Sequence, residues 1–142
     1  MSREIAITPQ QAWVAGSLAD VESAVSVAMS TVGGVLVGLY EVPCDMCGVS
    51  TRPGSGHILF WDLPKISRVF FSRIPSVGDF LPVRWVLAEE AGGVWVRVPL
   101  PARSSTMGDD PEWLPIARLV ARCVEHAFQR MMTEMTPLVR TR

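Results

Sequence analysis

Three cysteines and two histidines are the residues of this chain best suited to chemistry. Cys44 and Cys47 lie three positions apart in the segment "PCDMCG", where proline and glycine favour a tight turn. Cys123 and His126 have the same spacing in a segment with helical periodicity, so both side chains lie on one helix face. Thiolate and imidazole are the usual ligands of structural zinc. The four residues therefore predict a closed zinc site that joins two distant parts of the chain.

Two other uses of these cysteines stay open. Cys123 falls on the apolar stripe of its predicted helix, where cysteine packs as a small hydrophobic residue, and His126 then faces water. Cys44 and Cys47 are alternatively a redox couple. A reactive couple needs a helix N-terminus that lowers the pKa of its first thiol, and no helix clearly starts at Cys47. His57 is a substitute zinc ligand, placed at the start of a predicted strand.

No catalytic motif accompanies the cysteines. The sequence contains no GxSxG, no phosphate-binding glycine loop, no HExxH and no deaminase pattern. Asp109 and Asp110 precede a predicted helix, where carboxylates usually cap the helix end. We therefore predict no catalytic residue and expect a protein that is not an enzyme, with a thiol-dependent enzyme as an alternative.

The composition predicts a folded protein without a large charged surface. The chain has 142 residues, 49% of them hydrophobic, and a mean hydropathy of +0.27, which is enough to form a core. A net charge of −1 argues against general binding to nucleic acid or anionic membranes. Glu4 interrupts any apolar leader, and free thiols are typical of a reducing compartment, so we expect a cytoplasmic protein.

One uncharged run, residues 23–40, is long enough to raise the question of a membrane span. Gly33 and Gly34 divide this run into a half with helical periodicity and a half with strand-like composition. We therefore expect no membrane span.

Hydrophobic periodicity and turn signals predict an alternation of helices and hairpins. A capping box at residues 8–11 predicts a short helix that reaches about Leu18. Ser17 is then expected to cap a second helix, which Gly33 and Gly34 end. The remaining expected elements are strands at 35–42 and 57–61, a short helix within 64–74 that also fits a strand, a hairpin over 80–100 turning at 91–93, and a long helix over 115–135.

This order of elements is typical of the α+β class. We expect one domain over residues 1–142, with a flexible C-terminal tail from about 136. Its antiparallel sheet should contain about four to five strands, with helices mainly on one face and a long C-terminal helix. The other face of such a sheet needs cover, and a homodimer would supply it.

Tryptophan is frequent, and core packing is its usual role. In the predicted hairpin, however, Trp85 and Trp95 are expected on the same face as Arg97. Tryptophan and arginine together are typical of protein–protein contact surfaces. We therefore expect these three residues to bind a partner, which is another protein or a second copy of the chain. The same composition stacks on single-stranded bases, so a zinc-stabilised nucleic-acid-binding regulator is an alternative.

The hairpin "VRWVLAEEAGGVWVRVPLP" is followed by a loop and the closing helix "EWLPIARLVARCVEHAFQRM". This arrangement resembles the type III secretion chaperone-like fold, which includes the YbjN-type proteins of bacteria. The resemblance rests on the pattern and order of elements over the last two thirds of the chain. It implies a dimeric or peptide-binding role without catalysis. The sequence thus predicts a small chaperone- or adaptor-like protein.

Overall fold

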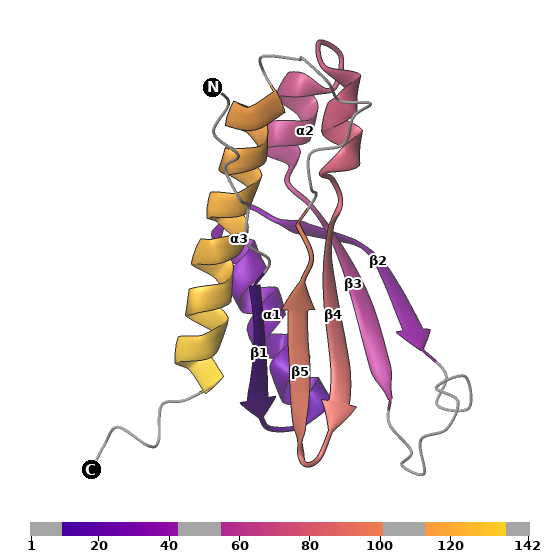
Figure 1. The fold of residues 1–142 in the computed structure, drawn as a ribbon, viewed down its shortest axis with the longest axis vertical. Helices are drawn as coiled ribbons and strands as arrows, with labels where there is room; N and C mark the ends of the chain where they lie inside the picture. The colour runs from indigo at the N-terminus through magenta and orange to yellow at the C-terminus, as the bar shows by residue number, and fades with distance from the viewer. Residues whose placement is uncertain (1–9, 43–54, 101–112, 136–142) are drawn as a thin grey trace, which may run out of the picture.

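The computed structural model describes residues 10–42, 55–100 and 113–135. These residues form a five-stranded antiparallel sheet and three α-helices, which confirms the predicted α+β class (Figure 1). The elements are β1 (Gln10–Ala15), α1 (Leu18–Thr31), β2 (Val35–Val42), β3 (Gly56–Asp62), α2 (Pro64–Phe70), the short 3-10 helix η2 (Pro75–Asp79), β4 (Val83–Glu90), β5 (Gly93–Val98) and α3 (Trp113–Met135).

The strands lie in the order β1-β5-β4-β3-β2, so that β1 and β2 form the two edges. The central hairpin is the one that the sequence predicts. Ala91 and Gly92 have φ angles of 52° and 81°, the left-handed pair that a tight hairpin turn requires. Glu90 and Gly93 pair across this turn, which fixes the register of β4 against β5.

Two long helices cover one face of the sheet. In Figure 1, α1 lies behind the strands and α3 runs along the β1 side. Their apolar stripes pack on the inward-facing residues of the strands to form the core. Its largest fully buried side chains are Trp85, Met29, Leu59, Leu87 and Met131. No polar or charged residue of the described ranges is buried.

The ends of α1 follow the sequence signals. Ser17 accepts a hydrogen bond from the backbone N–H of Asp20 at 3.1 Å, which is the predicted cap. At the other end Gly33 has a φ of 80°, and the N–H of Gly34 bonds to the Met29 carbonyl at 2.8 Å. The uncharged run thus divides into α1 and β2. Among the described residues, no helix is long and apolar enough to cross a membrane.

The first element differs from its prediction. A capping box predicts a helix from residue 8 to about Leu18, but Gln10–Ala15 form the edge strand β1. This segment pairs with β5 from Gln10 opposite Val98 to Ala15 opposite Gly93. The backbone hydrogen bonds and the burial of Val14 outweigh the local helix signal. The short helix predicted within 64–74 is confirmed as α2, and the predicted tail from 136 lies outside the described residues.

Candidate functional site

The sheet face opposite the helices, here called the open face, carries two half-exposed tryptophans. Trp13 of β1 and Trp95 of β5 are directly opposed in the antiparallel register. Paired residues point to the same face of a sheet, so both side chains stand on the open face. Their exposed fractions are 44% and 43%, far more than for the buried tryptophans of the core. Together they form an aromatic patch at one side of the sheet.

Trp13 is held in place by its surroundings. Its indole Nε1 donates a hydrogen bond to the Glu90 carbonyl at 3.1 Å, next to the hairpin turn. Its ring lies over Gly93, where any Cβ would collide with the ring and would lie 2.6 Å from the Val14 carbonyl oxygen. The glycine therefore makes room for the indole, and the hydrogen bond and the close packing fix the position of the Trp13 ring.

Two arginines extend the patch across the open face. Arg97 follows Trp95 by two positions and pairs with Val86 of β4. Arg84, also on β4, pairs with Phe60 of β3. Both side chains are exposed, and neither makes an ion pair with another described residue. The face thus combines aromatic surface with the positive charges of these two arginines.

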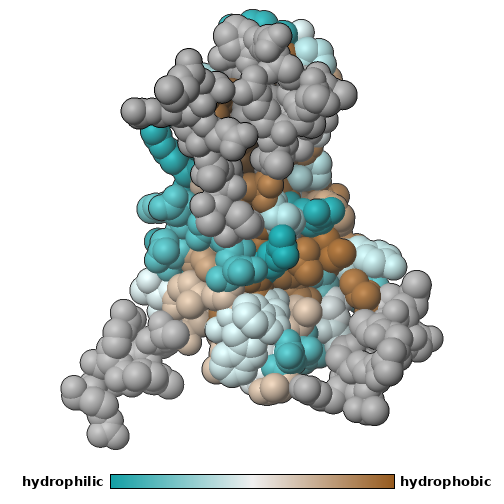
Figure 2. Space-filling view, viewed as in Figure 1, coloured by the Kyte–Doolittle hydropathy of each residue, from teal (hydrophilic) through white to brown (hydrophobic). Residues whose placement is uncertain are grey.

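A shallow hollow of about 310 Å³ lies at one end of this face. Phe60, Pro82 and Arg84 are among the residues that line it. In Figure 2, hydrophobic surface crosses this side of the molecule between hydrophilic areas. The open face therefore offers both apolar contact area and a recess beside a cation.

Trp85 is not part of the open face, which corrects the prediction. It is fully buried on the helix side, where its ring stacks on Phe128 of α3 with centroids 5.8 Å apart. The reason is register: Ala88 pairs with Trp95 and Val86 with Arg97, so Trp85 falls on the other face. Its indole N–H has no hydrogen-bond partner among the residues that the structure describes. Only Trp95 and Arg97 of the predicted three share an exposed face.

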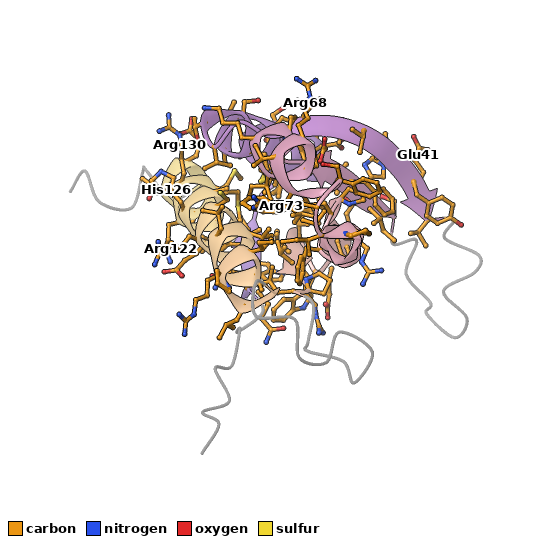
Figure 3. The ribbon with its side chains drawn as sticks, turned by 90° about the horizontal axis from the view of Figure 1, so that it is seen from above. Glu41, Arg68, Arg73, Arg122, His126 and Arg130 are labelled. Atoms are coloured by element: carbon orange, nitrogen blue, oxygen red, sulfur yellow. The ribbon has the colours of Figure 1, made fainter. Side chains whose placement is uncertain are left out.

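Two of the four predicted zinc ligands, Cys123 and His126, lie in the described part of the chain. Cys44 and Cys47 lie outside the described residues. Cys123 is half-buried against the core, and this burial raises the pKa of its thiol. His126 is exposed and points away from the sheet, between Arg122 and Arg130 on α3 (Figure 3). Within the described ranges, no three His, Cys, Asp or Glu residues could hold a metal ion. A site shared with Cys44 and Cys47 remains a prediction.

His57, the substitute ligand, has a different partner in the structure. Its Nδ1 lies 2.8 Å from Glu22 Oε2 of α1, in a partly buried pair that joins the helix to β3. Glu41 of β2 is its register partner in the sheet. The contact between His57 and Glu22 connects α1 to the sheet. This structural role accounts for His57 without a bound metal.

Trp13 is the site residue that sequence reasoning misses. Its segment carries a capping signal and a proline, which favour a helix and hide the strand. The burial of β1 alternates along the strand: Gln11, Trp13 and Ala15 are exposed, whereas Ala12 and Val14 are more buried. A period of two residues in the sequence is the pattern that could have indicated this strand.

No family model matches the sequence, and no curated protein matches it. Among solved structures, the chain is similar to the crystal structure of the uncharacterized conserved protein DUF302 from Bacillus stearothermophilus. The TM-score is 0.73 at 19% sequence identity, and the match covers 89% of this chain and 99% of that one. At this identity the similarity shows the fold. It overturns the resemblance to the type III secretion chaperone-like and YbjN-type fold, which rested on element order alone.

Proposed function

We propose that this chain is a non-catalytic, adaptor-like module that binds a segment of another protein on its open face. The observation that carries the proposal is the opposed pair Trp13 and Trp95, each half-exposed on a rigid sheet. Tryptophan and arginine are the residues most often found at the energetic centre of protein interfaces. A preorganised aromatic surface also loses little conformational entropy when a partner binds.

The charge of the molecule favours a protein partner over nucleic acid. The chain has a net charge of −1, so its two open-face arginines act within a nearly neutral protein. Nucleic acid would require a wider positive surface to neutralise successive phosphates. A peptide with apolar side chains and one or two carboxylates fits the combination of Trp95, Arg97 and Arg84.

The proposal is tested by selecting peptides from a random displayed library on the purified chain and measuring their affinity by calorimetry. Trp95→Ala should weaken binding by about 30-fold or more, as expected for a residue at the energetic centre of an interface. The matched control is Val27→Ala, because Val27 is 48% exposed on α1, on the helix side of the sheet. Equal affinities for both variants would contradict the proposal.

The nucleic-acid alternative is tested with a single-stranded oligonucleotide. Phosphate contacts cause a steep loss of affinity as salt rises, whereas aromatic and apolar contacts do not. Tight, strongly salt-dependent binding of the oligonucleotide that is lost in Arg97→Ala would show that the partner is nucleic acid rather than a protein.

A further inference from the structure

The edge strand β2 is the most exposed apolar element of the described chain. It hydrogen-bonds to β3 on one side, and no described strand pairs with its other side. In Figure 1 its arrowhead end lies at the side of the sheet farthest from α3, and Figure 3 shows this end extending beyond the helices. An unpaired strand edge presents free N–H and C=O groups that can pair with another chain.

Its side chains are apolar on both faces of the sheet. Five of the eleven exposed large hydrophobic residues of the described chain lie in this eight-residue strand. They are Val35, Leu36, Val37, Leu39 and Tyr40, with exposed fractions between 43% and 57%. Pairing with β3 places Leu39 on the helix side, opposite Leu59, and Tyr40 on the open face, opposite Ile58. No described helix or further described strand covers them, and each is about half-exposed.

The strand lacks most of the devices that protect natural edges. It contains no lysine, arginine or proline, and Glu41 is its one charged residue. A register irregularity lies between Leu36 and Gly38, so the regular pairing with β3 begins at Gly38. A surface of this kind is uncommon on a protein that remains monomeric.

We infer that β2 pairs with β2 of a second copy, so that two sheets join into one. A strand that pairs here must be apolar on both faces, and β2 itself has that composition. A two-fold axis makes the pairing antiparallel and presents the same residues from both sides.

Like charges do not oppose this arrangement, because Glu41 is the one charged residue of β2. With the axis at Leu39, Gly38 of one copy lies opposite Tyr40 of the other, and Glu41 lies opposite Val37. The two Glu41 residues are then four positions apart along the strands, about 13 Å, so the carboxylates do not meet. The leucines pair on the helix side, and each tyrosine covers a glycine on the open face.

This inference stands independently of the proposed function, because β2 contains none of the residues of the Trp13–Trp95 patch. It adds one structural consequence. Pairing of the edges about an axis perpendicular to the sheet places the two open faces on the same side, so a dimer presents two patches to one partner.

The experiment compares the native mass of the full chain with that of Leu39→Lys by sedimentation equilibrium over a range of concentrations. Two lysines facing each other at the axis should weaken self-association by about 100-fold or more. The control is Leu119→Lys, because Leu119 is 40% exposed on α3 at the other side of the molecule. A dimer for wild type and Leu119→Lys, with a folded monomer for Leu39→Lys, is the expected result.

A mixture of charged variants and hydrogen exchange test the same pairing in two further ways. An equimolar mixture of Leu39→Lys and Leu39→Glu should recover the dimer mass, since opposite charges then meet at the axis. In wild type, hydrogen exchange of the β2 amides that point away from β3 should slow as concentration rises. A monomeric wild type, a dimer that Leu39→Lys leaves intact, or exchange in β2 that does not depend on concentration would overturn the inference.

Discussion

Replacing Gly93 with alanine tests the geometry of the open face directly. The new Cβ would collide with the Trp13 ring and lie 2.6 Å from the Val14 carbonyl oxygen, so the indole must move. Movement of the ring also breaks its 3.1 Å hydrogen bond to the Glu90 carbonyl. Overpacking costs about 1–3 kcal/mol and the lost hydrogen bond about 0.5–1.5 kcal/mol. We therefore expect a destabilisation of about 2–4 kcal/mol.

The neighbouring Gly92 supplies a matched control. Its φ is 81° and a Cβ there meets nothing within 4 Å, so Gly92→Ala introduces backbone strain of about 1–2 kcal/mol and no collision. Urea denaturation of each variant, alone and combined with Trp13→Ala, separates the two causes. Removing the indole should reduce the cost of Gly93→Ala by at least about 1 kcal/mol and leave that of Gly92→Ala unchanged. Equal costs in both backgrounds would refute the placement of Trp13.

Three further outcomes follow from buried and reactive groups. Trp85→Ala should cost about 3–5 kcal/mol in urea denaturation, whereas Trp85→Phe should cost below about 2 kcal/mol, because it keeps an aromatic ring and removes an indole N–H without a partner among the described residues; equal costs would contradict this expectation. Burial raises the pKa of the Cys123 thiol, so the unfolded chain loses this proton first and stability should fall as pH rises above about 8.5. Cys123→Ala should lessen that fall, and an unchanged pH dependence would contradict it. If zinc joins Cys44 and Cys47 to Cys123 and His126, chain purified without added metal should contain zinc, and Cys44→Ser and Cys123→Ser should destabilise about equally, with little further loss in the double variant; metal-free protein would exclude this site.

The central hairpin shows how far the sequence can predict the site. Alternation and the glycine pair predict both strands and the turn, and the structure confirms them. A turn placed loosely at 91–93 leaves the register open by one residue, however, and one residue exchanges the two faces. The observed pairing of Glu90 with Gly93 puts Trp95 outside and Trp85 inside. A shift of the register by one residue would have put Trp85 and Trp95 on the same face, as predicted from the sequence.

Long-range pairing explains what the sequence could not predict. The segment of β1 has local helix signals, and its strand conformation depends on β5, which begins at Gly93, far along the chain. No local pattern contains that information. Trp13 therefore joins the open face only when the fold brings β1 beside the hairpin, as the opposition of Trp13 and Trp95 shows.

The strand β2 poses the reverse problem, because its conformation was predictable and its position was not. A strand as apolar as "VLVGLYEV" is typical of the buried centre of a sheet, where both faces are covered. The topology instead places it at an edge, with Leu39 and Tyr40 each about half-exposed on opposite faces. An extension of the sheet beyond β2, as we infer above, would bring the local sequence and the fold into agreement. A second β2 restores the environment that the sequence specifies, because each strand then becomes an interior strand with apolar neighbours on both sides.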